Sequence, residues 1–196
     1  MYYLNSCDWC TDGQNCYDEN MRYGTLTFER ALDKPELLAK PTYEYLESHT
    51  LQGVWVSEID PALADTAAFC DAYKISPEVS ANCVIVEAKR DERVWYAACI
   101  VLATTRVDVN GAVRKLLEAR KTSFAPMDVA INLTKMEYGG ITPIGLPPEW
   151  PIFIDSHVLE QEKLIVGSGI RGSKIITTAK VLGELSGVQV VTIVKN

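Results

Sequence analysis

The fold is decided by residues 81–104, which read ANCVIVEAKRDERVWYAACIVLAT. Two apolar, β-rich runs, Ala81–Lys89 and Val94–Thr104, flank the charged turn Arg90-Asp91-Glu92-Arg93. Long runs of this composition on either side of a short polar turn are typical of two antiparallel strands buried in a core. We therefore predict a central β-hairpin with the rest of the domain packed around it.

Helical and strand patterns alternate on both sides of this hairpin, without internal repeats or low-complexity linkers. Upstream, we expect a helix over 35–49 that Pro41 interrupts, a strand over 54–58, and a helix over 60–74 with Asp60 as N-cap. Downstream, the expected elements are helices near 108–117, 126–134 and 179–185, and strands at 121–124, 152–155, 164–166, 174–177 and 188–194. The pattern predicts one α+β or α/β domain over residues 21–196.

The composition of the chain is that of an ordinary globular protein. Of its 196 residues, 47% are hydrophobic and 23% are charged, which suits one core. The net charge is −7, with the acidic excess in the first half, so we expect no DNA binding and look for RNA contact only in the second half. The sequence has no run long enough to span a membrane and no secretory signal pattern, so we expect a cytoplasmic protein.

Residues 1–20 differ in composition from everything that follows. They contain no Lys or Arg, and they hold Cys7, Cys10 and Cys16. This spacing could indicate zinc, but no fourth Cys or His follows nearby, and we favour an N-terminal extension outside the core. The other three cysteines lie in apolar patterns and are expected to be reduced: Cys70, Cys83 and Cys99. We expect no metal and no organic cofactor.

The common catalytic motifs are missing from the sequence. The glycines of 167–172 are too closely spaced for a dinucleotide-binding fingerprint, and there is no phosphate-binding loop and no zinc-protease motif. The feature that stands out is the loop 138–147, YGGITPIGLP, because glycines let a backbone approach a ligand closely. The alternative, that this loop only turns the chain, remains open.

Three motifs occur in a characteristic order. They are the Gly-x-x-x-Pro loop from Gly139 to Pro143, the strand Ile152–Asp155 that ends in Asp, and the turn Gly169-Ile170-Arg171-Gly172. Together they resemble the YbaK/ProRS-like editing domains, which deacylate mischarged aminoacyl-tRNAs. The resemblance runs from about Val54 to Val194. It implies a mixed, mostly antiparallel, barrel-like sheet flanked by helices, in agreement with an α+β class.

The chain departs from this family at one position. Editing members typically carry a lysine on the first hairpin strand, and the resemblance implies that this lysine holds the 3′-terminal region of the tRNA. Here the corresponding residue is Asn82, or Cys83 if the alignment slips by one residue. A neutral group therefore replaces an ammonium group, which would weaken a charge-assisted contact with phosphate.

The resemblance implies two groups of site residues. The first group would hold the reacting ester, with loop amides on the carbonyl oxygen and Asn82 orienting water or a ribose hydroxyl: Asn82, Gly139, Gly140, Thr142, Pro143 and Asp155. The second group would bind the substrate, with Arg171 on phosphate: Ser168, Gly169, Arg171, Gly172 and Lys121. Asp155 could instead cap the segment that starts at Ser156. Lys174, Lys121 and Arg120 could add to the RNA contact of Arg171, or they could be ordinary solvated surface.

The function implied by the resemblance is that of a trans-acting aminoacyl-tRNA deacylase for a small mischarged amino acid. Its expected partner is the 3′ acceptor end of an aminoacyl-tRNA. An aminoacyl-tRNA synthetase is a second candidate partner. The alternative is a non-catalytic binding module of the same fold, for an aminoacyl or nucleotide-like ligand or a synthetase. Position 82 is the sequence feature that divides the two.

Overall fold

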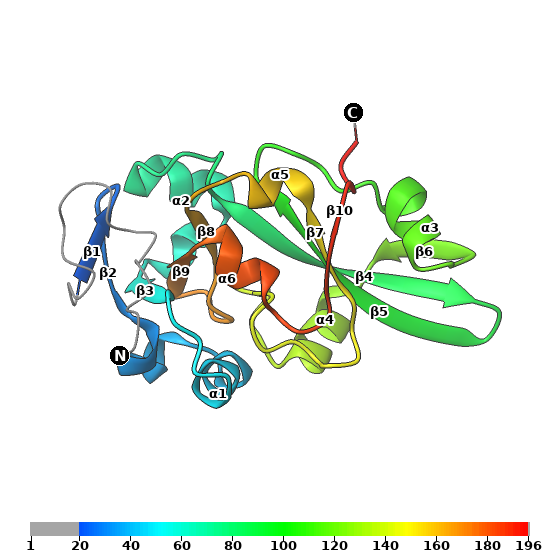
Figure 1. Ribbon diagram of the computed structural model, residues 1–196, viewed down its shortest axis with the longest axis horizontal. Coiled ribbons are helices and arrows are strands. Elements are labelled where there is room, and N and C mark those ends of the chain that lie inside the picture. Colours follow the sequence, from blue (N-terminus) through cyan, green and yellow to red (C-terminus); the bar gives the residue numbers. More distant parts are fainter. Residues whose placement is uncertain (1–19, 196) are drawn as a thin grey trace, which may run out of the picture.

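The strands of residues 20–195, the part of the chain that the computed structural model describes, form two five-stranded sheets (Figure 1). The first sheet is antiparallel throughout and has the order β1-β2-β3-β9-β8. Its strands are β1 (Asn20–Tyr23), β2 (Leu26–Arg30), β3 (Trp55–Glu58), β9 (Ser173–Thr177) and β8 (Leu164–Gly167). Strands β8 and β9 are buried along their whole length, so this sheet provides a rigid wall of the core.

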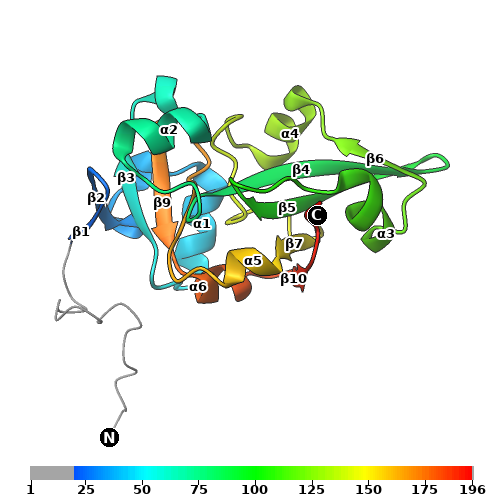
Figure 2. The ribbon, with the colours of Figure 1, turned by 90° about the horizontal axis from the view of Figure 1, so that it is seen from above.

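The second sheet contains the predicted hairpin. Its order is β10-β7-β5-β4-β6, with β10 (Val188–Val191), β7 (Ile152–Asp155), β5 (Arg93–Leu102), β4 (Ala81–Arg90) and β6 (Lys121–Phe124). Strands β4 and β5 pair from Ala81 opposite Leu102 to Arg90 opposite Arg93, which confirms the hairpin. Strand β7 runs parallel to both of its neighbours. The far end of the hairpin projects from the body of the molecule (Figure 2).

The two sheets do not close into a barrel. Among the described residues, the only backbone bridge between them joins Ser80, just before β4, to Ile165 of β8. A closed barrel needs continuous strand pairing around its circumference, and a single bridge does not supply it. The α+β class and the mostly antiparallel pairing are confirmed, whereas the barrel-like sheet is better described as two sheets.

Helices flank the sheets, and several are very short. They are α1 (Lys40–Ser48), α2 (Thr66–Tyr73), α3 (Arg114–Leu116), α4 (Met127–Thr134), α5 (Ser156–Leu159) and α6 (Ala179–Gly183), with the 3-10 turns η1 (Ala31–Asp33), η2 (Pro35–Leu37) and η3 (Pro61–Leu63) and the π turn η4 (Val109–Val113). Proline 41 lies in the first turn of α1, so it begins that helix rather than interrupting one.

The predicted helix over 60–74 is divided in two. The Asp60 carboxylate accepts a hydrogen bond from the Ala62 amide and caps η3, and the Asp65 carboxylate accepts from the Ala67 amide and caps α2. The two N-caps start two separate helices, because the extended backbone of Asp65 ends the turn that η3 begins. The second cap sets the position at which α2 begins.

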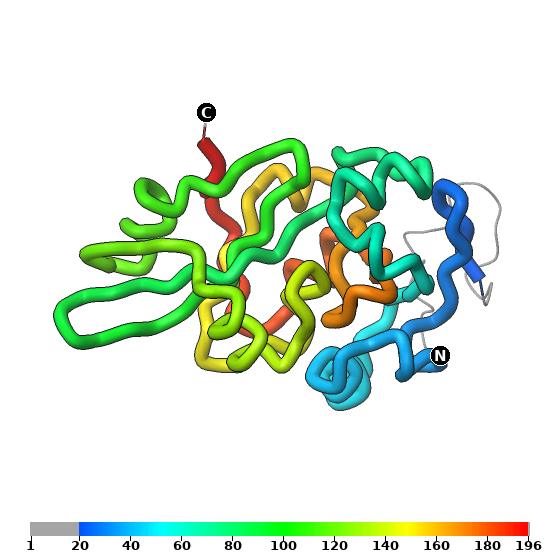
Figure 3. The backbone as a smooth tube through the Cα atoms, turned by 180° about the vertical axis from the view of Figure 1, so that it is seen from behind, coloured from blue at the N-terminus to red at the C-terminus, as the bar shows by residue number. Residues whose placement is uncertain are grey.

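The largest hydrophobic cluster packs the two sheets against each other. Its fully buried members include Leu46, Ile100, Ile144, Ile154, Leu164 and Ile175. A second cluster fills the space between the hairpin and η4, and a third lies between the first sheet and α2. Figure 3 shows the N-terminal strands (blue) and the turn of the hairpin (green) at opposite ends of the molecule. The largest cluster lies between these two ends.

The expectations for residues 1–19 lie outside the described part of the chain. Cys7, Cys10 and Cys16 belong to residues 1–19, so the extension, its boundary with the domain and the zinc alternative remain predictions; the first strand starts at Asn20. Within residues 20–195, the three cysteines Cys70, Cys83 and Cys99 are free, as expected. No helix of that range is long and apolar enough to cross a membrane.

Candidate functional site

A cavity of about 530 Å³ lies between the start of α2, strand β4 and the glycine-rich loop. Its lining residues come from separate parts of the chain: Ala64, Asp65, Thr66, Ala67, Pro77, Ala81, Asn82, Cys83, Val84, Ile85, Ala103, Phe124, Ala125, Ala130, Tyr138, Gly139, Ile141, Gly167 and Lys174. Most of these are small or apolar, and the few polar side chains are typical of a small-molecule site. Phe124 and Tyr138 are more than half exposed, so two aromatic rings stand at the rim.

Asn82 lies on the wall that β4 provides. The Thr66 hydroxyl donates a 2.7 Å hydrogen bond to Asn82 Oδ1. Thr66 is the first residue of α2, whose start is fixed by the Asp65 cap, so the cap indirectly fixes the Asn82 side chain. With Oδ1 engaged, the amide group of Asn82 keeps its N–H donors for a ligand. Asn82 therefore lies on the cavity wall, and its catalytic role stays a prediction.

The glycine-rich loop contributes Gly139 and Ile141 to the cavity, but not Gly140, Thr142 or Pro143. The Gly140 amide already donates to the Glu137 carbonyl oxygen at 2.9 Å. A Cβ on Gly140 would collide with the backbone of Ile170, so this glycine permits two loops to pack together. A Gly140→Val substitution would therefore disturb the packing of these two loops.

Gly139 and Ile141 differ from Gly140 in their hydrogen bonding. Neither of their amides has an acceptor among residues 20–195, and both residues line the cavity. Gly139 has a φ of +86°, a backbone conformation that favours glycine. These two amides, rather than that of Gly140, are the donors that the loop can offer to a ligand.

Thr142 and Pro143 are buried behind the loop. The Thr142 side chain is completely buried, and its Oγ1 has no hydrogen-bond partner within the described part of the chain. Neither residue lines the cavity, so the structure does not bring them together with Asn82.

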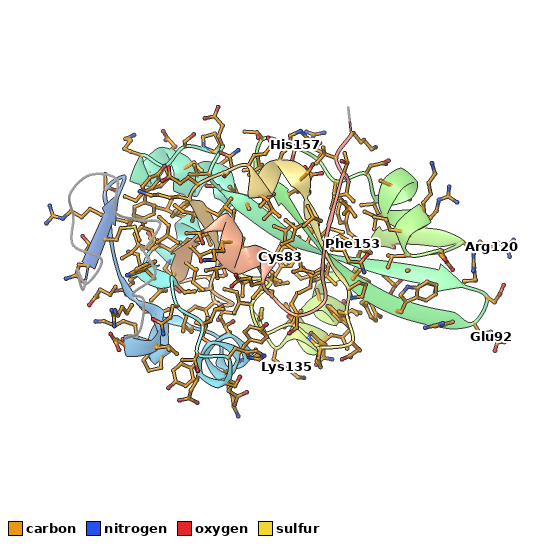
Figure 4. The ribbon with its side chains drawn as sticks, in the orientation of Figure 1. Cys83, Glu92, Arg120, Lys135, Phe153 and His157 are labelled. Atoms are coloured by element: carbon orange, nitrogen blue, oxygen red, sulfur yellow. The ribbon has the colours of Figure 1, made fainter. Side chains whose placement is uncertain are left out.

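Asp155 lies at the end of β7, away from the cavity lining. It is 1% exposed, and its carboxylate accepts hydrogen bonds from the amides of His157 and Ile193, at 3.2 and 2.8 Å, and pairs with His157 Nδ1 at 2.7 Å. This pairing raises the pKa of His157. Figure 4 shows His157 well separated from Cys83, which is on the cavity wall. Of the two roles considered for Asp155, the structure shows the capping role.

The turn 168–172 packs behind the glycine-rich loop. Ser168 is fully buried and bonds with Ser173, and Gly169 donates its amide to the Gly140 carbonyl oxygen at 2.7 Å. The Arg171 guanidinium donates to the backbone oxygens of Tyr138 and Pro61, at 3.2 and 3.0 Å. Neither Ser168, Gly169, Arg171 nor Gly172 lines the cavity. Arg171 thus holds the glycine-rich loop and η3 together, which was not anticipated.

Lys121 is exposed at the start of β6, outside the cavity lining. The same strand ends at Phe124, which reaches the cavity rim. Lys121 and the cavity are therefore about three residues, or roughly 10 Å, apart along one edge strand.

Sequence reasoning considered Lys174 only as a basic residue for RNA contact or as solvated surface, and did not foresee that it lines the cavity. It is 7% exposed, lies on β9 and lines the cavity. Its Nζ donates to the Ala64 carbonyl oxygen at 3.1 Å and stands 5.4 Å from the centre of the Phe69 ring. Burial lowers the pKa of Lys174 to about 8. The available signal was a single lysine in the otherwise apolar pattern of a buried strand.

Residues 20–195 offer neither a group of metal ligands nor a reactive thiol in the cavity. No group of three or more His, Cys, Asp or Glu side chains there could hold a metal ion. Burial raises the pKa of the Cys83 thiol far above its ordinary value, so the thiolate needed for nucleophilic attack is disfavoured. The site is a cavity of backbone donors and a few polar side chains.

Known proteins share this architecture. A crystal structure of a proposed trans-editing enzyme for prolyl tRNA synthetase gives a TM-score of 0.70 at 18% identity, over 81% of this chain and 97% of that chain. The hypothetical protein APE2540 gives 0.70 at 18% identity, over 80% of this chain and 100% of that chain. At such identities these likenesses show the fold. Residues 60–185, more than half of the sequence, match the family described as the aminoacyl-tRNA editing domain. The chain is a member of the aminoacyl-tRNA editing domain family.

Proposed function

We propose that this chain acts in trans to hydrolyse the ester bond between a small mischarged amino acid and the 3′ end of a tRNA. The observation that carries the proposal is the cavity, about 530 Å³ in volume, apolar over most of its wall and polar near Asn82 and Lys174. Its volume is in the range of small-molecule sites. Membership of the editing family supports an aminoacyl-tRNA substrate.

The amino-acid side chain would lie against the apolar wall. Ala81, Val84, Ile85 and Ala130 supply this wall with short side chains. A pocket of this kind separates amino acids that differ by one methylene by only about 1–3 kcal/mol, and mainly excludes those that are too large. A small amino acid is therefore the favoured substrate.

The terminal nucleotides would bind at the rim. Phe124 is 58% exposed and Tyr138 is 55% exposed, and both border the cavity. Unpaired bases stack on exposed aromatic rings, each for about 1–3 kcal/mol. Lys121, at the other end of β6 from Phe124, would meet a backbone phosphate of the same strand of RNA.

Hydrolysis would rely on positioned donors rather than on a strong base. The free amides of Gly139 and Ile141 would donate to the ester carbonyl oxygen, and one such donor contributes about 3–4 kcal/mol in other hydrolases. The Asn82 amide group would orient the attacking water. The water oxygen bonds to the carbonyl carbon, the ester C–O bond breaks, and the leaving ribose oxygen takes up a proton, assisted by the neighbouring ribose hydroxyl.

The second candidate is a non-catalytic binding module. It is favoured by one observation, the neutral Asn82 at the position where related editing domains carry a lysine. The same cavity would then bind an aminoacyl or nucleotide-like ligand, or present it to an aminoacyl-tRNA synthetase.

The test is deacylation by the full chain across a panel of aminoacylated tRNAs, correctly charged and mischarged. We expect faster release of at least one small amino acid than in the no-enzyme control, and a loss of about tenfold or more in Asn82→Ala. The matched control is Asn132→Ala, an exposed asparagine on α4, which should retain the full rate. Binding of aminoacyl-tRNA without any acceleration would favour the binding module instead.

A further inference from the structure

Lys174 reaches the cavity because its neighbours on both sides are small. In the first sheet it lies between Ser57 of β3 and Gly167 of β8. Ser57 is buried and Gly167 has no side chain and itself lines the cavity. The long lysine side chain therefore extends over Gly167 and past the Phe69 ring toward the start of α2, where its ammonium group meets Ala64.

The hydrogen bonding of this ammonium group is incomplete. Its one hydrogen-bond acceptor within residues 20–195 is the Ala64 carbonyl oxygen, and no carboxylate of that range lies within ion-pair distance. An ammonium group has more than one N–H to donate, and a buried cation without an anionic partner is unfavourable. The nearby Asp65 carboxylate is occupied in capping α2.

Lys174 and Asn82 form hydrogen bonds with the same short segment, residues 64–66. Ala64 accepts the hydrogen bond from Lys174, and Thr66, two residues later, donates to Asn82. The positive charge that is absent from β4 at position 82 is thus present on the adjacent wall, contributed by β9.

We infer that the Lys174 ammonium group binds an anionic oxygen of the ligand in this cavity. The inference rests on the proposed function for the identity of that ligand, in which two oxygens have the required charge: a phosphate oxygen of the terminal nucleotide, and the oxyanion that forms as water attacks the ester. Both would complete the hydrogen bonding of the ammonium group and neutralise its buried charge. Lys174 is then a substrate-binding residue in the first case and a catalytic residue in the second.

The experiment compares the full-length chain with Lys174→Met, Lys174→Gln and the control Lys180→Met, whose lysine is exposed on α6. Methionine keeps the length and the contact with Phe69, and glutamine keeps a donor for Ala64. Thermal unfolding establishes that each variant folds. Calorimetry then measures binding of adenosine 5′-monophosphate and of adenosine, and single-turnover assays measure deacylation of the tRNA panel.

If Lys174 binds phosphate, the wild type prefers adenosine 5′-monophosphate to adenosine by about 10- to 100-fold, and both Lys174 variants lose this preference. If it binds the oxyanion, the affinities stay unchanged and the single-turnover rate falls by about 100-fold or more. The control keeps both properties. Folded Lys174 variants that match the wild type in binding and rate overturn the inference. A lysine-dependent phosphate preference without deacylation supports the inference and rejects the proposed function, and a wild type with neither property rejects both.

Discussion

Asp155 and Lys174 are both charged, almost completely buried and located on core strands, yet their hydrogen bonding differs. The Asp155 carboxylate receives hydrogen bonds from two backbone amides and from His157. The Lys174 ammonium group donates to one backbone oxygen and faces a cavity. A buried charge that is satisfied within the chain stabilises the fold, whereas one left incomplete at a cavity is available to a ligand.

The largest effect is expected from Asp155→Ala. This change leaves the buried Ile193 amide without an acceptor and removes the N-cap of α5, so we expect the free energy of unfolding to fall by about 3 kcal/mol. Urea denaturation measures the loss. The folded fraction should deacylate tRNA at the wild-type rate. A variant of normal stability that has lost activity would show that Asp155 takes part in catalysis.

The opposite change in stability is expected from Lys174→Met. The folded pKa of about 8 lies below the ordinary value of 10.5, so the folded protein binds this proton more weakly than the unfolded chain does. The contribution of Lys174 to the free energy of unfolding should therefore rise as the pH increases from about 8 to about 10.5. Removing the charge should raise the free energy of unfolding at pH 7 by about 2 kcal/mol, after the lost hydrogen bond to Ala64 is subtracted.

Urea denaturation at pH 7 and at pH 10 checks this prediction. The excess stability of Lys174→Met over the wild type should be smaller at pH 10 than at pH 7, whereas Lys180→Met should show no such change. Cys70, Asp65 and Arg171 also act on the Lys174 charge, the first two raising and the last lowering its pKa. If Lys174→Met is less stable than the wild type at pH 7, the lysine is held by stronger contacts than those described.

The double variant Lys174→Met/Asn82→Lys moves the positive charge from β9 to β4. If the cavity requires one cation near residues 64–66, whichever strand supplies it, the double variant should recover about tenfold of the phosphate preference lost in Lys174→Met. Nucleotide calorimetry measures the recovery. No recovery in a folded double variant would mean that the direction of approach from β9 matters as much as the charge.

The smallest effect on stability is expected from a change of His157, the half-exposed partner of Asp155. Because Asp155 raises the pKa of His157, the pair stabilises the fold fully below pH about 6.5, and this stabilisation is lost as the pH rises through the folded pKa of His157. The imidazole is half exposed, so solvent screens the pair. His157→Gln should remove this shallow pH dependence in thermal unfolding and leave deacylation unchanged; a change in deacylation would contradict a purely structural role.

Much of the fold could be predicted because it follows local patterns. The hairpin of β4 and β5 is visible in its two long apolar runs, and the capping role of Asp60 in its position before Pro61. The strands β1 and β2 were not predicted, although Met21, Tyr23, Leu26 and Phe28 alternate, because strands of four and five residues give only a short alternating pattern.

The site was harder to predict because it is assembled by tertiary contacts. Asn82 and the glycine-rich loop could be connected through the family resemblance, and both contribute to the cavity wall. Which loop amides are free depends on the packing of residues 140 and 169–170 against each other, which no local pattern reveals. For the same reason Lys174 resembled a surface lysine, since its burial depends on the small neighbours Ser57 and Gly167.

The most direct test of the central claim is to close the cavity and measure deacylation. Ala67 is exposed and lines the cavity, so Ala67→Trp should fill its entrance without disturbing the core, whereas Ala62→Trp adds the same ring outside the lining. We predict that the full chain releases a small mischarged amino acid from tRNA, that Ala67→Trp reduces the initial rate by at least about tenfold, and that Ala62→Trp retains it. Equal rates for the wild type and a folded Ala67→Trp, or no release by the wild type, would contradict the assignment of this cavity as an editing site.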